Sequence, residues 1–510
     1  MDGYIKKLIH KDYLCINVTN KKYNEMETEM DIVSVSKCES DSESGSEIEN
    51  ENYNDILLQT CKEQIDDLQK FVDELIISDK ERTQLSETAY NLICETIQSE
   101  PMLYINPNFH EQLLEQVSEL LIQQLGDIFI NMDYIRETIN KCVEVALYLF
   151  YKKFAPIRSY KNTTPSFYTE EIMTAKIDYL KSVPQPEQRT PEWYAFRQNV
   201  LTASNIWKVF STPSTNNQLI YEKCSPFDAD KYNNTFTNTS SPMHWGQRFE
   251  SVSVMYYESI YNTKVGDFGC VPHKSIKCLA ASPDGINISK GTGRYGRMLE
   301  IKNIVNRVID GVPKMEYWIQ MQVQMEVCDL DECDFLETRF VEYESEDAFI
   351  RDFSVSPFHK GLIMYFNDGG KPLYEYSKWG ATREEIEVWE NAMLEKHSKL
   401  VVVQNIYWKL TEISCVLVLR NKLWFDAAKP MIENTWEVIV KEKESGEYVK
   451  REPKRKTNKK TFASATKSSC LIDTNLFNIC EDNVCEEEYT VYDISGSEID
   501  IIPEMEEGEA

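Results

Sequence analysis

Two carboxylates and a lysine lie close together in the middle of the chain. Asp284 sits between a turn-prone proline and a glycine, and Glu300 and Lys302 lie two residues apart in the apolar run Met298–Ile304. Because side chains alternate faces along a strand, Glu300 and Lys302 are expected on one face and Ile301 on the other. Carboxylate oxygens bind Mg²⁺ or Mn²⁺, and a neighbouring lysine can orient an attacking water or stabilise charge on a phosphate.

On its own this pattern is weak evidence for a metal site, because a surface turn followed by a strand with a salt bridge would contain the same residues. The flanking segments add two candidates. Glu250 lies on an expected helix over Trp245–Tyr261 and is a further candidate metal ligand, with an exposed helix carboxylate as the alternative. Downstream, Tyr317–Gln322 contains Gln320 and completes the set of polar motifs.

A second group of polar residues precedes these motifs. Trp193 and Arg197 are followed by the run Thr202-Ala203-Ser204. A buried tryptophan beside an arginine and hydroxyl groups can form a phosphate pocket, because arginine binds phosphate through two parallel hydrogen bonds. The alternative is a capped helix whose arginine makes an ordinary salt bridge.

Charge is distributed unevenly along the chain. The net charge of −29 is unusual for a protein that binds nucleic acid. Residues 184–325, however, contain 15 Lys and Arg against 12 Asp and Glu, so this segment carries +3 and the remainder −32. A locally basic groove can still attract phosphate if the acidic segments lie away from it.

Cysteine usage and hydropathy exclude several classes of protein. The 14 cysteines form no C-x-x-C pair, which predicts free thiols in a reducing compartment and disfavours a zinc or iron–sulphur site. No apolar run approaches the roughly 20 residues of a membrane-spanning helix. The first 12 residues lack the apolar core of a signal peptide, so secretion is not expected.

Composition predicts five segments. Residues 1–53 are expected to be a disordered acidic segment, 54–155 a helical bundle, and 184–368 a mixed α/β core. Residues 369–446 are expected to be a mainly helical extension, and 447–510 a disordered tail that is first basic and then acidic.

Several parts of this division leave alternatives open. The run Ile413–Leu419 fits a strand or a buried helix equally well. The helical segment 54–155 could dock a partner or DNA, or serve packing alone. The basic block Lys450–Lys460 is consistent with nuclear import, a DNA contact or a solvated linker.

Taken in order, these motifs resemble the YqaJ-type viral recombinase family, the lambda-exonuclease branch of the PD-(D/E)XK nucleases. The resemblance runs from about Arg189 to Val327. It rests on Trp193-x-x-x-Arg197 with Thr202-Ala203-Ser204, Trp245-Gly246-x-x-x-Glu250, Ser282-Pro283-Asp284-Gly285, Glu300-Ile301-Lys302 and Tyr317-x-x-Gln320-x-Gln322. The long arms and acidic tails are similar to those of giant-DNA-virus versions of this nuclease.

The resemblance implies an α/β fold with a restriction-endonuclease-like core, in which helices flank a mixed central sheet, and with helical N- and C-terminal additions. It also implies two Mg²⁺ or Mn²⁺ ions per site and assigns residue roles. The expected metal ligands are Glu250, Asp284 and Glu300, and the catalytic set is Lys302, Glu300, Asp284 and Gln320. The expected contacts to a terminal phosphate are Arg197, Ser204 and, as a weaker candidate, Ser282.

The function implied by the resemblance is 5′→3′ degradation of double-stranded DNA ends in viral recombination, repair or genome processing. A structure-specific endonuclease, or a virion DNA-binding or structural protein with a vestigial nuclease core, are the alternatives. A single-strand-annealing partner and a homo-oligomer stay open, and no membrane partner is expected. The expected location is the host cytoplasm at a viral factory, or the virion, with the nucleus as a further option. The insertion between Ser211 and Pro242 leaves the substrate geometry open.

Overall fold

The structure is a computed structural model, and it describes residues 77–125, 132–161, 168–227, 239 and 241–453. The predictions for the acidic segment 1–53, for the tail after residue 453, and for the helical pattern before residue 77 lie outside the described residues. So do residues 228–238 and 240 of the insertion expected between Ser211 and Pro242.

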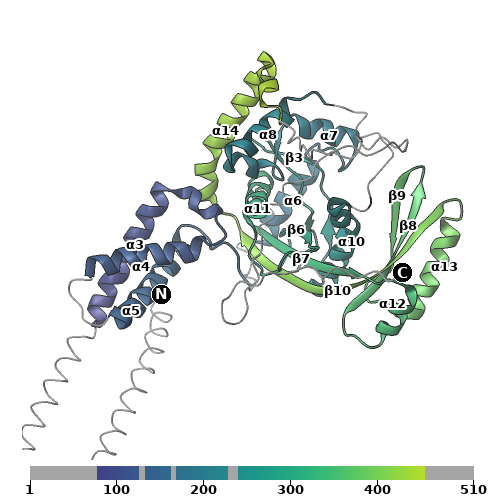
Figure 1. Cartoon of the computed structure of the whole chain (residues 1–510), viewed down its shortest axis with the longest axis horizontal. Coiled ribbons are helices and arrows are strands. Elements are labelled where there is room, and N and C mark those ends of the chain that lie inside the picture. The colour runs from purple at the N-terminus through teal and green to yellow at the C-terminus, as the bar shows by residue number, and fades with distance from the viewer. Residues whose placement is uncertain (1–76, 126–131, 162–167, 228–238, 240, 454–510) are drawn as a thin grey trace, which may run out of the picture. The chain divides into compact units, whose positions relative to one another are not determined.

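The described part of the predicted N-terminal helical segment is helical (Figure 1). It contains α3 (Asp79–Ser99), the 3-10 helix η1 (Pro101–Ile105), α4 (Phe109–Leu125) and α5 (Met132–Lys153). Helix α3 starts at a capping box, in which the Ser78 side chain accepts from the backbone of Glu81 and the Glu81 side chain accepts from the backbone of Ser78. Apolar residues at helical spacing, such as Leu113, Val117 and Leu121, are buried.

Short helices and a small sheet connect this segment to the core. Helices α6 (Glu170–Ser182), α7 (Pro191–Gln198) and α8 (Pro213–Cys224) and the 3-10 helix η2 (Ile206–Phe210) surround a sheet with the strand order β1-β4-β3. Its strands are β1 (Leu201–Thr202), β3 (Val271–Pro272) and β4 (Leu279–Ala281), and β1 and β4 run parallel.

A mixed sheet of seven strands forms the centre of the fold, which confirms the predicted α/β class with a mixed central sheet. The strand order is β2-β5-β6-β7-β10-β8-β9. Strands β6 and β7 are parallel, and the other neighbouring pairs are antiparallel. The strands are β2 (Val265–Gly266), β5 (Gly285–Asn287), β6 (Met298–Asn303), β7 (Glu332–Glu342), β8 (His359–Asp368), β9 (Lys371–Tyr376) and β10 (Val401–Leu419).

Strand β6 lies between two helices, α10 (Pro242–Tyr261) and α11 (Met315–Cys328) (Figure 1). The expected alternation of faces along β6 is present. Met298 belongs to the hydrophobic cluster around α11, whereas Leu299 and Ile301 pack in the cluster that contains Phe249 of α10. The face of β6 that carries Glu300 and Lys302 is therefore the α11 face.

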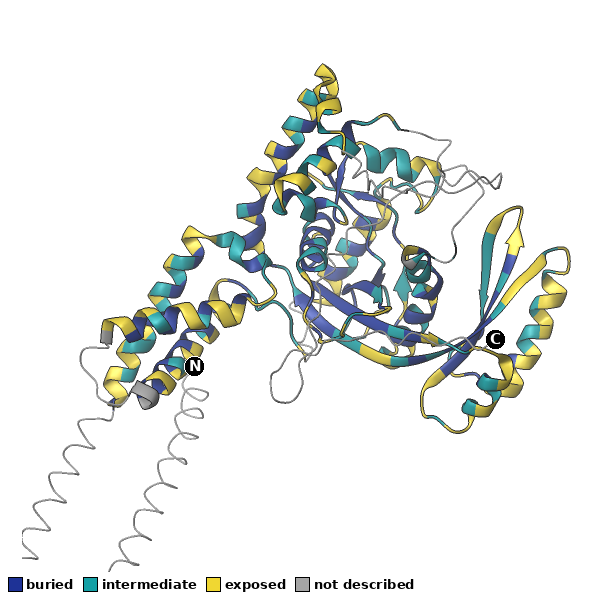
Figure 2. Ribbon diagram, in the orientation of Figure 1, coloured by how far each residue is buried: buried dark blue, intermediate teal, exposed yellow. Residues whose placement is uncertain are grey.

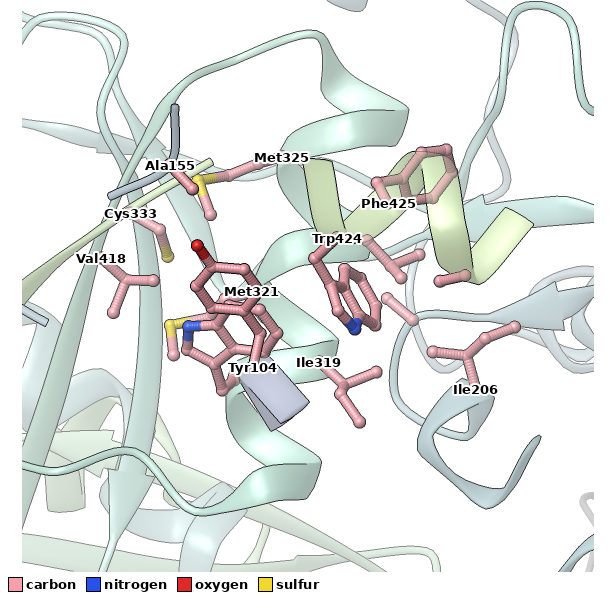
Figure 3. Close-up of a cluster of buried hydrophobic side chains, with 14 of the residues drawn as sticks. Tyr104, Ala155, Ile206, Ile319, Met321, Met325, Cys333, Val418, Trp424 and Phe425 are labelled. Carbon is pink, nitrogen blue, oxygen red and sulfur yellow. The ribbon is translucent and has the colours of Figure 1, made fainter. Parts of the chain in front are cut away.

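Helix α11 is buried on nearly all sides, as its dark colour in Figure 2 shows. Its apolar residues are distributed around the whole circumference, which is the pattern of a core helix rather than a surface helix. Ile319, Met321 and Met325 meet Trp424 of α14 (Lys422–Ser445) and Tyr104 of η1 in one cluster (Figure 3). A helix packed in this way holds its polar side chains in fixed positions.

The prediction that residues 369–446 form a mainly helical extension missed two strands. The segment contains β9 and the 19-residue strand β10, which pairs with β7 on one side and β8 on the other. The boundary at residue 368 therefore falls inside the sheet. The apolar, β-branched run Ile413–Leu419 is a strand because β7 offers it a complete hydrogen-bonding edge, and this long-range pairing is not visible in local periodicity.

The remaining helices of the described C-terminal part agree better with the sequence. Helix α13 (Arg383–Lys396) starts at the capping box of Thr382 and Glu385. Helix α12 (Glu346–Phe353) packs beside it under the outer strands. The expected disorder from residue 447 is wrong for the first residues of the tail, because Glu447–Arg451 form the 3-10 helix η3 and Arg451 pairs with Glu442. In the described ranges, no helix combines the length and apolar character needed to cross a membrane.

Candidate active site

Asp284 and β6 are joined by a direct contact. Asp284 lies in the turn between β4 and β5, and its Oδ2 accepts a hydrogen bond of 2.8 Å from the backbone N–H of Ile301. Gly285 lets this turn approach β2, because a Cβ at that position would lie 2.1 Å from Cγ1 of Val265. The turn therefore places Asp284 beside the strand that carries Glu300 and Lys302.

The Glu300 carboxylate is completely buried, and each of its two oxygens has a donor. Oε1 accepts from the ammonium of Lys302, and Oε2 accepts from Nε2 of Gln324 on α11 at 2.8 Å. Lys302 also lies over the ring of Tyr317, 4.9 Å from its centroid. Burying a carboxylate is unfavourable unless donors compensate its charge, so these contacts hold Glu300 in one orientation.

Gln324 is a residue that the sequence reasoning missed. Gln320, the predicted glutamine, lies one turn earlier on the same helix and is half-buried. Spacing of three and seven residues after Tyr317 places Gln320 and Gln324 on one helix face, so the pattern itself contained this signal. Gln322 points elsewhere: its Nε2 donates to Leu419 O and its Oε1 accepts from the backbone N–H of Asn421, at the start of α14.

Glu250 lies on α10, as predicted, and forms an ion pair. Its Oε2 accepts from Nη2 of Arg189 at 2.8 Å, with side-chain exposures of 31% for Glu250 and 48% for Arg189. Arg189 has a φ of 67°, in the left-handed region that favours glycine. Its side chain therefore reaches Glu250 from a backbone conformation that most residues avoid.

Negative charge accumulates among the three carboxylates. Burial, and then the neighbouring charge of Glu300, raise the pKa of Asp284 well above its ordinary value, and Glu250 adds to the increase. Lys302 and the Ile301 N–H act in the opposite direction. Burial lowers the pKa of Lys302, but the charges of Glu300 and Asp284 outweigh it and raise this pKa above its ordinary value. Without a metal ion, Lys302 is therefore an ammonium and not a base.

The chemistry of these groups fits a hard divalent cation. All three candidates offer carboxylate oxygens, and their mutual repulsion would be relieved by a positive ion. Among the described residues, no three acidic, histidine or cysteine side chains stand ready as a ligand set. The reason is visible at two of them, because Arg189 holds Glu250 while Lys302 and Gln324 hold Glu300.

The predicted phosphate contacts also come together. Nη2 of Arg197 donates to Oγ of Ser204 at 2.8 Å, and its guanidinium lies 4.1 Å from the centroid of the Trp193 ring. Nε1 of Trp193 donates to Oγ of Ser282 at 3.2 Å. Arg197, Ser204 and Ser282 thus belong to one chain of contacts that passes through Trp193. Their contact with a phosphate stays a prediction.

A buried lysine that the sequence reasoning did not identify contacts the backbone of Arg197. Nζ of Lys223 on α8 donates to the carbonyl oxygen of Arg197 at 2.6 Å, and the residue is 6% exposed. Burial, and then the charge of Arg197, lower the pKa of Lys223 to about 7. Lys223 therefore supports the backbone from which Arg197 projects.

Comparison with known protein families gives one match in this region. Residues 192–331 match the model of the family described as "YqaJ-like viral recombinase domain". This segment is similar to YqaJ-like viral recombinase domains. The domain contains Arg197, Ser204, Glu250, Ser282, Asp284, Glu300, Lys302, Gln320 and Gln324, whereas Arg189 precedes it and β10 follows it.

The chain is also similar to a viral protein over a longer stretch. The chain is 29% identical over 351 residues to a protein of Acanthamoeba polyphaga mimivirus that is described as uncharacterized. The alignment spans 60% of this chain and 61% of the mimivirus protein, less than two thirds of its length.

Two crystal structures of LHK-Exo, described as an alkaline exonuclease from Laribacter hongkongensis, are also similar. One of them is a complex with dAMP. They are 18% and 20% identical, with TM-scores of 0.30 and 0.29, and cover 51% of this chain and 97% of theirs. Likeness at this level does not extend their activity to this chain.

Proposed function

We propose that the chain is a metal-dependent deoxyribonuclease that hydrolyses phosphodiester bonds at double-stranded DNA ends in the 5′→3′ direction during viral recombination, repair or genome processing. The observation that carries the proposal is the joining of two sites on one turn. Asp284 contacts the strand of Glu300 and Lys302. Ser282, two residues earlier, accepts from Trp193, whose ring lies against the Arg197 guanidinium that bonds Ser204. The description of residues 192–331 as a viral recombinase domain supports the same process.

The chain's own residues would prepare the reaction. Glu250, Asp284 and Glu300 would hold one or two Mg²⁺ or Mn²⁺ ions, which when bound supply an activated water and neutralise charge on the phosphate. The ammonium of Lys302, fixed by Glu300 and Tyr317, would orient the nucleophile and stabilise negative charge on the phosphate oxygens. A cation on the carboxylates would offset the charges that raise the pKa of Lys302, so the ammonium would give up its proton more readily and could then act as a base in its neutral form.

The pocket of Arg197 and Ser204 would bind the terminal phosphate through charge-assisted hydrogen bonds. The ring of Trp193 packs against the guanidinium of Arg197, and Lys223 donates a hydrogen bond to the backbone carbonyl of Arg197. A pocket of this kind distinguishes a phosphorylated end from a hydroxyl end, whereas the metal site does not. The combination favours an exonuclease over an enzyme that cuts within a duplex.

The experiment that tests the proposal compares linear duplex DNA with the same sequence as a covalently closed circle, in Mg²⁺ and in excess EDTA. Both substrates carry internal label, and products are resolved on denaturing gels. We expect mononucleotides from the linear duplex in Mg²⁺, no products in EDTA and little cleavage of the circle. Equal cleavage of the circle would support the endonuclease alternative, and no cleavage of either substrate in Mg²⁺ would support a vestigial core.

A further inference from the structure

Ser282 belongs to both sites at once. Its side chain accepts the hydrogen bond from Nε1 of Trp193, whose ring stacks on the guanidinium of Arg197. Its backbone carbonyl accepts a bond of 3.3 Å from Nε2 of Gln324. The same nitrogen donates at 2.8 Å to Oε2 of Glu300. An unbroken path of contacts therefore runs from the phosphate pocket to the metal-binding carboxylate.

Gln324 is the residue in this path that contacts both sites. A displacement of Ser282 is therefore expected to change the contact of Gln324 with Glu300. The residue has no exposed surface, and α11 is fixed by its packing on both sides. Its amide nitrogen has two protons, and both are taken, by Ser282 and by Glu300. Its oxygen Oε1 is buried without a hydrogen-bond partner. Such an acceptor is unfavourable, so the amide gains by any movement that brings it a donor, for instance a water.

The two bonds of the amide differ in length, which indicates the direction of the coupling. The bond to Glu300 is the shorter one, and together with Lys302 it occupies both carboxylate oxygens. The bond to Ser282 is longer and can shorten if Ser282 moves toward α11. A shorter bond to Ser282 would draw the amide away from Glu300 and make Oε2 available to a cation.

We propose that Gln324 is a positioning residue that couples the phosphate pocket to the metal site, so that a terminal phosphate on Arg197 and Ser204 raises the affinity of the carboxylates for a divalent cation. This inference rests on the proposed function. Coupling between two sites is reciprocal, so a bound cation must favour a phosphorylated end over a hydroxyl end by the same factor. The enzyme would complete its metal site at a correct DNA end and not on internal duplex.

The coupling can be measured by binding alone. The affinity of the protein for a short duplex, labelled with fluorescein at its far end, is measured by fluorescence anisotropy for 5′-phosphate and 5′-hydroxyl forms, each in Ca²⁺ and in EDTA at constant ionic strength. Gels on the same samples verify that the DNA stays intact in Ca²⁺. The coupling factor is the preference for the phosphorylated end in Ca²⁺ divided by that preference in EDTA. We expect about fivefold or more for the wild type, the lower end of ordinary allosteric coupling.

Two variants interrupt the path, and two serve as controls. Gln324→Met keeps the volume and removes the amide, and Trp193→Phe keeps a ring over Arg197 and removes the N–H donor to Ser282. Both should bring the coupling factor close to one. Gln322→Met, on the same helix but bonded to Leu419 and Asn421, should keep the wild-type factor. Gln84→Met, at an exposed position of α3, is the control for the substitution itself.

The outcomes separate this inference from the proposed function. If Gln324→Met does not fold, Trp193→Phe decides. A wild-type factor of one in a protein that cleaves linear DNA in Mg²⁺ overturns the coupling and leaves the nuclease in place. A full factor in Trp193→Phe, or in a folded Gln324→Met, overturns the role of the path. Absence of any metal-dependent cleavage by the wild type contradicts the proposed function itself.

Discussion

Replacing Asp284 with asparagine should stabilise the metal-free protein while abolishing its activity. Asparagine has the same shape, and its Oδ1 can accept the hydrogen bond that Ile301 N–H now donates to the carboxylate. The substitution removes one negative charge from beside Glu300. Burial and that neighbouring charge raise the pKa of Asp284 in the folded protein, so ionising it opposes folding at every pH above its ordinary value.

The sign and the pH window follow from this shift. A carboxyl whose pKa is raised by folding binds its proton more tightly in the folded state, so stability falls as pH rises from the ordinary carboxyl pKa near 4 toward the raised value. The gain from Asp284→Asn should therefore be absent below about pH 4 and largest at neutral and alkaline pH. Its expected size is about 0.5–2 kcal/mol, the range of substitutions that relieve a strained functional site.

Thermal unfolding in EDTA at pH 4, 6 and 8 measures this effect. Asp267→Asn, at an exposed position, changes the net charge equally and should leave the transition almost unchanged. Adding Mg²⁺ should then stabilise the wild type and not Asp284→Asn, because ligand binding to the folded state raises the midpoint. A metal-free Asp284→Asn protein that is less stable than wild type at pH 8 would refute the idea of uncompensated charge in this site.

Three further predictions address neighbouring residues. Lys302→Met should lower the cleavage rate by about 10²-fold or more and destabilise the metal-free protein by about 3 kcal/mol, because the buried Glu300 loses its cation. If the variant cleaves linear DNA at the wild-type rate, Lys302 is not catalytic. Arg189→Gln should change stability by less than about 1 kcal/mol, since the pair with Glu250 is partly exposed, yet tighten Mn²⁺ binding measured by calorimetry, and unchanged binding would mean that Arg189 does not compete with the cation. Arg197→Ala should reduce the preference for a 5′-phosphorylated over a 5′-hydroxyl duplex in degradation assays, and an intact preference would assign the end recognition to other residues.

The sequence predicted the parts of the site that depend on local periodicity. Glu300 and Lys302 share a face of β6 because side chains alternate along a strand. Glu250 lies on a helix that ends at Tyr261, as predicted, and begins at Pro242, three residues before the predicted start. Arg197 and Ser204 meet because a short helix and strand connect them. Each of these relations spans few residues, so backbone geometry determines it.

Contacts between distant parts of the chain could not be predicted in the same way. Gln324 reaches Glu300 because α11 packs on one face of β6, and Arg189 reaches Glu250 from 61 residues away. The sequence of β10 has enough apolar residues for a buried helix, and it forms a strand because it pairs with β7. These outcomes depend on which surfaces meet in the folded chain, information that a single sequence contains only indirectly.

The central claim is that Asp284, Glu300 and Lys302 form a metal-dependent site for hydrolysis of DNA. The most direct test is the release of nucleotides from one linear 5′-phosphorylated duplex by wild type and by Asp284→Asn, each in Mg²⁺ and in excess EDTA, with thermal unfolding to verify that both proteins are folded. We predict release by the wild type in Mg²⁺ and in no other sample. Release by folded Asp284→Asn at the wild-type rate, or by the wild type in EDTA after its metal content is shown to be negligible, would contradict the claim.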